Sequence, residues 1–78
     1  MKQEIETYGE LVQTIRKLQN ITQIELAAKT GISQTYISQI ENNKRVPTIQ
    51  ILERIAKGCE AKIEISFSIS LKKEKDNL

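Results

Sequence analysis

Apolar residues recur along most of the chain at the three- and four-residue intervals that are typical of amphipathic helices. Leu11, Ile15 and Leu18 stand at i, i+4 and i+7, which predicts a helix with one buried face that ends near Leu18. A later helix is predicted to begin after Thr48 and to end at Gly58. Its expected buried positions are Ile49, Leu52, Ile55 and Ala56.

Between these two helices the chain is predicted to form a helix, a tight turn and a further helix. Leu26 and Ala27 are the inward positions of the first, and the small alanine allows a close crossing. Gly31 lies where that helix must stop and the backbone needs positive φ. Ile37 and Ile40 recur at i and i+3 and give the next helix one buried stripe. This arrangement is typical of the DNA-binding helix-turn-helix.

Polar residues at the predicted helix boundaries support this division. Thr7 with Glu10, and Thr22 with Glu25, have the spacing of a capping box. In that motif the two side chains each bond a backbone amide at the helix start. Asn20 follows the first helix and is expected to stop it in a left-handed conformation. Four helices in a chain of 78 residues predict a mainly α fold in one domain.

The segment TQIELAAKTGISQTYISQIENNKRVPT resembles the XRE family, the Cro and phage-repressor type of helix-turn-helix. The resemblance covers about residues 8–58 and implies a four-helix, repressor-like DNA-binding domain. One position departs from the family pattern, because Asn43 replaces the usual glycine, although asparagine also tolerates left-handed φ. The matching residues are Thr22, Gln23, Glu25, Leu26, Ala27, Gly31, Ser33, Gln34, Ile37, Ser38, Glu41, Pro47 and Thr48.

The outward face of the second helix of this motif carries amides and hydroxyls rather than Lys and Glu. Gln and Asn can bond adenine bidentately, and Ser or Thr can bond either base pair. Lys44 and Arg45 follow that helix and are expected to contact the phosphates that flank the groove. The alternative is a plain helical corner without nucleic acid. The expected DNA-binding residues are Gln23, Ser33, Gln34, Thr35, Tyr36, Ser38, Gln39, Asn42, Lys44, Arg45 and Thr48.

Individual roles differ within this set. Gln34 opens the helix and is expected to reach a base edge, while Gln23 is expected to bond a phosphate and brace Gln34. Tyr36 could stack on the domain or bond a phosphate. The family resemblance further implies a structural ion pair between Arg16 and Glu41, because phage repressors pair Arg and Glu at the matching positions. The alternative is two independent surface charges.

After Cys59 the period of the pattern changes from about 3.6 to 2. From Ala61 to Leu71 apolar residues alternate with Lys, Glu and Ser, which predicts one long β-strand. A single strand cannot satisfy its own backbone groups, and no second strand is predicted in this chain. We therefore expect it to pair with its twofold mate in a homodimer. The expected dimerisation residues are Ile63, Ile65, Phe67 and Ile69.

Two alternatives remain for this segment: a fifth helix, as in many phage repressors, and an exposed strand that captures another protein by β-addition. The chain then divides into a flexible N-terminus, the helix-turn-helix domain, the dimerisation strand and a flexible charged tail. Their expected bounds are residues 1–6, 7–58, 59–71 and 72–78.

The composition removes several other functions. The chain has no His and a single cysteine, Cys59, so an internal disulfide, the common zinc sites and His-based acid–base catalysis are excluded. Cys59 is expected to be a packing residue, with a redox switch as the alternative. We expect no cofactor, no metal and no enzyme activity. No apolar run approaches a membrane span, so no membrane partner is expected and the expected compartment is the cytoplasm.

These observations predict a sequence-specific DNA-binding repressor that binds double-stranded DNA as a dimer on a palindromic operator. A C-terminal strand after the fourth helix resembles HipB-like antitoxins, which implies autoregulation and a cognate toxin as a further partner. The alternatives are a stand-alone phage or mobile-element repressor and a protein-bridging module with the same fold. The net charge of only +2 means that any nucleic-acid surface must come from clustered charge.

Overall fold

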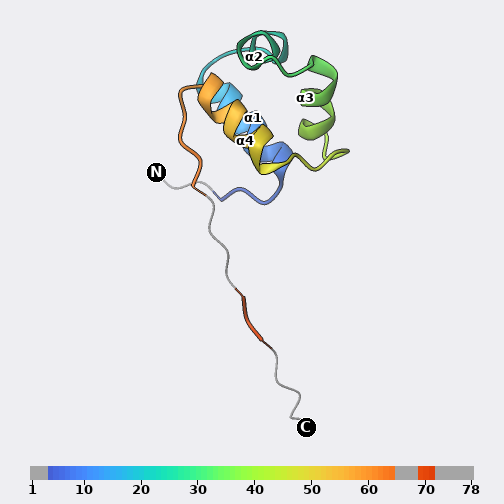
Figure 1. Ribbon diagram of the computed structural model, residues 1–78, viewed down its shortest axis with the longest axis vertical. Helices are drawn as coiled ribbons and strands as arrows, with labels where there is room; N and C mark the ends of the chain where they lie inside the picture. The colour runs from blue at the N-terminus through green and yellow to red at the C-terminus, as the bar shows by residue number, and fades with distance from the viewer. Residues whose placement is uncertain (1–3, 65–68, 72–78) are drawn as a thin grey trace.

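The computed structural model describes residues 4–64 and 69–71, and four helices follow one another in this part of the chain (Figure 1). They are α1 (Tyr8–Leu18), α2 (Gln23–Thr30), α3 (Gln34–Glu41) and α4 (Ile49–Gly58). The number and order of helices confirm the predicted four-helix domain. None of the described helices has the length and apolar character needed to cross a bilayer.

The helices pack around one apolar core. α3 contacts both α1 and α2, and α4 contacts the same two helices from the other side (Figure 1). The core therefore holds α3 in a fixed orientation on α1 and α2. Its buried members are Val12, Ile15, Leu26, Ile32, Ile37, Ile40, Leu52, Ile55 and Cys59.

The buried stripe of α3 is the one predicted, and so is that of α4 except at its first position. In α2 Leu26 is buried as predicted, but Ala27 is half-buried and Thr30 is buried as well.

The stripe of α1 is shifted. Leu18 was expected inside and is 78% exposed, whereas Val12 is fully buried. Ile49 was also expected inside and is 51% exposed at the start of α4. The spacing of apolar residues is compatible with burial of either of two overlapping faces of a helix. The positions of the neighbouring helices determine which face is buried.

Three predicted turns have the expected backbone. Gly31 ends α2 with φ of 73°, and its amide donates to the carbonyl of Ala27 at 2.9 Å. Asn20 and Asn43 have φ of 57° and 59°, so asparagine at the family's glycine position keeps the left-handed turn. Gly58 is the last residue of α4, but the left-handed residue that follows is Glu60, with φ of 53°.

The two predicted capping boxes differ. At α2 both bonds are present, with Glu25 N donating to Thr22 Oγ1 at 3.0 Å and Thr22 N donating to Glu25 Oε1 at 2.8 Å. At α1 Thr7 caps the helix as expected. The carboxylate of Glu10, however, accepts from the amide of Glu6 rather than from that of Thr7. The start of α1 is thus held by a bond that extends one residue further back.

Gly9 lies where the start of α1 touches the end of α3. A Cβ atom at this position would lie 2.6 Å from the Glu41 carbonyl oxygen and 2.8 Å from that of Ile40. The Gly9 amide also donates to Asn43 Oδ1 at 3.1 Å. Gly9 therefore permits the contact that places the end of α3 against α1. The residues next to Gly9 in the sequence did not indicate this contact.

The predicted strand is only partly described. Residues 61–64 and 69–71 form no strand or helix in the single chain, and residues 65–68 lie outside the described part. A strand is defined by its pairing, so one copy of the chain does not test the predicted ribbon. Ala61 and Ile63 pack partly against the core, whereas Ile69 is 85% exposed.

Candidate nucleic-acid interface

The recognition-type helix α3 begins at a well-formed cap. Ser33 accepts a hydrogen bond from the amide of Tyr36 at 3.1 Å, which uses the hydroxyl that was expected to meet DNA. One residue earlier, buried Ile32 fills the core, and its amide donates to Thr30 Oγ1 at 3.2 Å. Thr30 in turn donates to the Leu26 carbonyl at 2.8 Å. The turn between α2 and α3 is therefore rigid and leaves Gln34 exposed at the start of α3.

Uncharged polar side chains line a shallow hollow on the outward face of α3. Its residues are Gln34, Thr35, Ser38 and Gln39. All four were predicted as DNA-binding residues, and the fold brings them together because Ile37 and Ile40 turn the opposite face inward. The hollow offers amide and hydroxyl groups that can both donate and accept, which is the chemistry of base edges.

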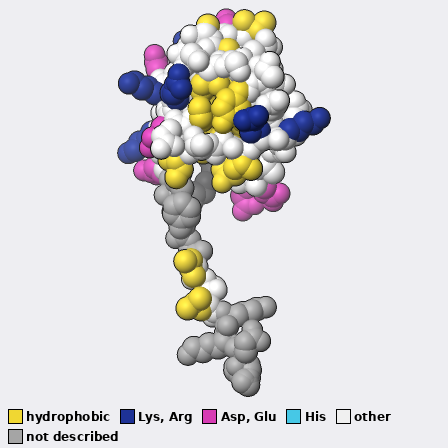
Figure 2. All heavy atoms as spheres, turned by 45° about the vertical axis from the view of Figure 1, so that its right-hand side comes forward, with side chains coloured by type: hydrophobic (Ala, Val, Ile, Leu, Met, Phe, Trp, Pro, Cys, Tyr) yellow, Lys and Arg dark blue, Asp and Glu magenta, His cyan; other side chains and the backbone are white. Residues whose placement is uncertain are grey.

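Ser38 is linked to Asn42 at the end of α3. Asn42 Nδ2 donates to the Ser38 carbonyl at 2.8 Å and to Ser38 Oγ at 3.3 Å. Lys44 follows in an exposed loop, and its backbone amide donates to the Gln39 carbonyl at 2.8 Å. Thr48 caps α4 by accepting from the Ile51 amide at 3.1 Å. In Figure 2 Lys and Arg side chains lie on both sides of a hydrophobic patch near the centre of the visible face.

Arg45 folds back over α3 instead of extending into solvent. Its Nε donates to Gln39 Oε1 at 3.1 Å, and its guanidinium carbon lies 5.0 Å from the centre of the Tyr36 ring. Tyr36 packs partly against the core. The structure thus favours the stacking alternative for Tyr36 and adds a cation above its ring.

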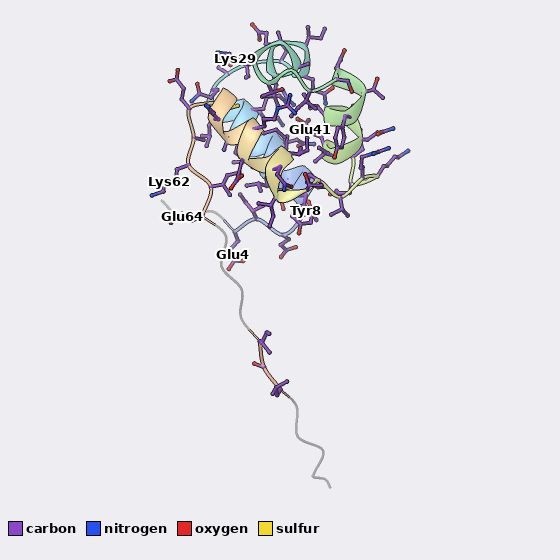
Figure 3. The ribbon with its side chains drawn as sticks, in the orientation of Figure 1. Glu4, Tyr8, Lys29, Glu41, Lys62 and Glu64 are labelled. Atoms are coloured by element: carbon purple, nitrogen blue, oxygen red, sulfur yellow. The ribbon has the colours of Figure 1, made fainter. Side chains whose placement is uncertain are left out.

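Arg16 and Glu41 form the ion pair that the family resemblance implied. Arg16 Nε lies 2.8 Å from Glu41 Oε2 and Nη2 lies 3.0 Å from Oε1, so the pair is bidentate. Arg16 Nη1 also donates to the Ile21 carbonyl at 3.0 Å. The hydrogen bonds to Glu41 raise the pKa of Arg16 above its ordinary value. Figure 3 shows Glu41 on the side of α3 that faces the other helices.

Gln23 joins this pair. Its Nε2 donates to Glu41 Oε1 at 3.0 Å, so the Gln23 amide is oriented by a buried carboxylate. One hydrogen on Nε2 and the amide oxygen remain for an outside group or for Gln34. The sequence predicted a role for Gln23 at the surface but not its link to Glu41, because that contact spans the turn.

A second hollow connects the start of α2 with the start of α3. Gln34 lines both hollows, so it stands where they meet. The fold therefore brings Gln23 and Gln34 to one surface, as predicted, and adds Lys17 and Asn20, which sequence reasoning missed. Asn20 was noted only for its backbone conformation. The second hollow is lined by Arg16, Lys17, Asn20, Ile21, Thr22, Gln23, Ile24 and Gln34.

The residues expected at a dimer interface are not assembled in the single chain. Ile63 lies partly against the core of its own domain, Ile69 is exposed, and Ile65 and Phe67 lie outside the described residues. Cys59 is buried in the core, and burial raises the pKa of its thiol, opposed by the nearby charge of Lys29. The neutral thiol is favoured, which agrees with a packing role. Within the described residues no group of acidic, His or Cys side chains has the arrangement of a metal site.

The helix-turn-helix family HTH_3 matches residues 12–65 of this chain. This chain belongs to the HTH_3 family. This chain is similar to the immunity repressor protein of Bacillus phage phi105, with 36% identity over 50 residues. The match covers 64% of this chain and 35% of the repressor, so the chain spans about a third of that relative's length.

Two solved structures extend the comparison beyond sequence. The restriction-modification controller protein C.Esp1396I, a tetramer in complex with its natural 35 base-pair operator, is similar with a TM-score of 0.66 and 42% identity. That similarity covers 70% of this chain and 72% of the controller chain. A HipB–O4 20mer complex is similar with a TM-score of 0.65 and 30% identity, and covers 87% of this chain and 100% of the HipB chain.

Proposed function

We propose that this HTH_3 chain is a transcriptional repressor that binds a palindromic operator as a homodimer. The observation that carries the proposal is the outward face of α3, where Gln34, Thr35, Ser38 and Gln39 line one uncharged polar hollow. A helix of this width fits the major groove of B-DNA, and these side chains can bond base edges there. The phage repressor and the operator-bound controller protein are similar to this chain and support the same function.

The proposed contacts divide into readers and anchors. Gln34 reads a base edge, since it is exposed at the junction of both hollows. Gln23, Lys44 and the capped start of α4 at Thr48 bond phosphates on either side of the groove. Ser33 and Asn42 act mainly by shaping the two ends of α3, because both already make hydrogen bonds within the helix.

The proposed dimer follows from the small footprint of one helix. One recognition helix reads only a few base pairs, whereas two helices about 34 Å apart read a palindrome on one face of the duplex. The segment 61–71 is proposed to hold the two copies together by antiparallel strand pairing. The similarity to the HipB complex covers 87% of this chain and supports a DNA-bound assembly of this kind.

A second candidate function within the same class is that of an autoregulating antitoxin with a cognate toxin. The similarity to HipB favours it, and the similarity to a phage immunity repressor favours a stand-alone regulator. A protein-bridging module is the alternative from another class. Salt separates it from DNA binding, because the logarithm of a DNA association constant falls by about 0.9 per phosphate contact for each tenfold rise in salt.

Replacing Gln34 by alanine tests whether this side chain contacts a base edge. We expect a loss of about 1–3 kcal/mol in binding to the selected operator and a much smaller loss on random duplex DNA. Fluorescence anisotropy titrations with both duplexes measure the difference. Gln19→Ala is the matched control, because Gln19 is an exposed glutamine at the end of α1 that lines neither hollow. An equal loss on both duplexes would show that Gln34 does not read sequence.

A further inference from the structure

Two side chains of α3 hold Arg45 in one orientation. Its Nε bonds Gln39 Oε1 at 3.1 Å, and its guanidinium lies over the Tyr36 ring at 5.0 Å. The ring is itself partly buried against the core, so it gives the guanidinium a fixed support. Exposed arginines usually keep their rotamer freedom, because ordering a long side chain costs entropy. Arg45 is therefore ordered before any partner binds, although it contributes nothing to the core.

The orientation leaves one edge of the guanidinium available. Nε is engaged by Gln39, and within residues 4–64 and 69–71 neither Nη atom of Arg45 has a hydrogen-bond partner. Gln39 also lines the hollow of α3, so Arg45 is joined to the C-terminal end of the same polar surface. A planar pair of donors thus stands beside the residues that are proposed to meet base edges.

A phosphate contact does not require this support. A phosphate attracts a point charge, and Lys44 beside it provides one on an exposed side chain without a side-chain partner among the described residues. A flat pair of donors matches two acceptors in one plane, and both a phosphate and the O6 and N7 atoms of guanine present such a pair. The bond of Arg45 to Gln39, which lines the hollow proposed to meet base edges, favours guanine between the two.

We propose that Arg45 reads a guanine through its two Nη groups, with Tyr36 and Gln39 as positioning residues. This assignment rests on the proposed function and replaces the phosphate contact that the sequence suggested for Arg45. It gives the chain a second reader, which comes from the loop after α3 and lies beside Gln39 near the end of that helix. The operator half-site then contains a G·C pair at the position that meets the end of the recognition helix.

The test begins with duplexes selected from a random pool by the wild-type protein. The selected half-site is expected to contain an invariant G·C pair, and its replacement by A·T should weaken wild-type binding about 5- to 150-fold. Arg45→Lys keeps the charge but not the planar fork. It should abolish the preference at that pair while the salt dependence of binding stays as in the wild type. Lys44→Ala is the contrasting variant, expected to reduce the salt slope by about 0.9 and to keep the preference.

A base analogue places the contact at a single atom. In 7-deazaguanine a C–H group replaces N7, so one of the two acceptors is lost while base pairing is kept. Wild-type binding should weaken with this base at the invariant position, whereas Arg45→Lys should bind both duplexes equally. The support of Tyr36 is tested in the same assay. Tyr36→Leu should reduce the preference for guanine, and Tyr36→Phe should retain it, because the ring rather than the hydroxyl carries the stacking.

Several results would contradict the assignment of Arg45 to a guanine. If Arg45→Lys keeps the full preference for guanine, or if Arg45→Ala only lowers the salt slope, Arg45 contacts a phosphate and the assignment is wrong. Selection of half-sites without an invariant guanine would overturn it too. If the wild-type protein enriches no sequence at all, the proposed function fails first and the assignment fails with it. Circular dichroism of each variant confirms that the helices are intact.

Discussion

Replacing Glu41 by alanine is expected to lower the free energy of unfolding by on the order of 3 kcal/mol. The side chains of Arg16 and Glu41 are 15% and 2% exposed, so removing one partner leaves the other charge largely buried. The loss also frees the Gln23 amide and removes the side-chain bonds from Arg16 of α1 to the end of α3. Urea unfolding followed by circular dichroism measures the change, with a shifted midpoint at an unchanged slope.

The exposed Glu53 of α4 supplies a matched control for this loss. Glu53→Ala should change stability by no more than about 0.5 kcal/mol, because this side chain has no ion-pair partner among the described residues. A double-mutant cycle with Arg16→Ala isolates the pair, and we expect coupling between the two substitutions. Near-zero coupling would mean that the two residues stabilise the fold independently, despite the 2.8 Å contact between Arg16 Nε and Glu41 Oε2.

The same variant connects stability to DNA binding. Glu41 is the only side chain among the described residues that accepts from both Arg16 and Gln23, so it fixes the orientation of Gln23 as well as that of α3. Glu41→Ala should therefore weaken operator binding even at temperatures where the protein stays folded. Gln23→Ala should weaken binding much less in the Glu41→Ala background than in the wild type, because the amide has already lost its support.

Local chemistry explains most of what the sequence predicted correctly. Gly31, Asn20 and Asn43 needed only their own backbone preferences to mark turns, and each has the expected positive φ. The inward positions Ile37 and Ile40 followed from helical spacing and a turn that fixes the angle of α3. The outward residues of α3 were then determined by exclusion. In each of these cases the sequence feature lies within a few residues of the structural feature that it predicts.

Contacts between distant parts of the chain were not predictable in this way. Gly9 permits the approach of α1 to α3, but its contacts are with Ile40, Glu41 and Asn43, more than 30 residues further along. The burial of Val12 in place of Leu18 depends on which helices cover α1. The contact of Arg45 with Gln39 and Tyr36 requires the loop to fold back over α3, and the spacing of the three residues does not indicate this.

The segment 61–71 poses a different problem, because its predicted structure needs a second copy. Ile69 and Leu71 are 85% and 88% exposed in the single chain, and Ile69 belongs to the apolar face that the alternation predicts. Large apolar side chains at this level of exposure gain free energy from any partner that covers them. Cys59 is buried, so a cut directly after Gly58 would also damage the core. Substitutions in the full chain are the better probe.

Charges on the apolar face are expected to dissociate the proposed dimer. Burial of Ile63, Ile65, Phe67 and Ile69 could contribute roughly 6–12 kcal/mol before the entropy of association is subtracted. Phe67→Lys together with Ile69→Lys removes about half of this, so the dimer dissociation constant should rise by about 150- to 20,000-fold. Sedimentation equilibrium measures the constant directly, and thermal unfolding of the variant shows whether the four-helix domain is intact.

The matched control places the same two charges on the other face of the predicted strand. Ser68→Lys together with Ser70→Lys changes the net charge equally and leaves every apolar position in place. Because alternate residues of a strand point to opposite sides, this variant should remain a dimer and keep its operator affinity. The apolar-face variant should bind an isolated half-site as the wild type does, yet lose most of its affinity for the palindrome. If both variants stay dimeric, the segment does not join the two copies, and another surface must set the spacing of the two α3 helices.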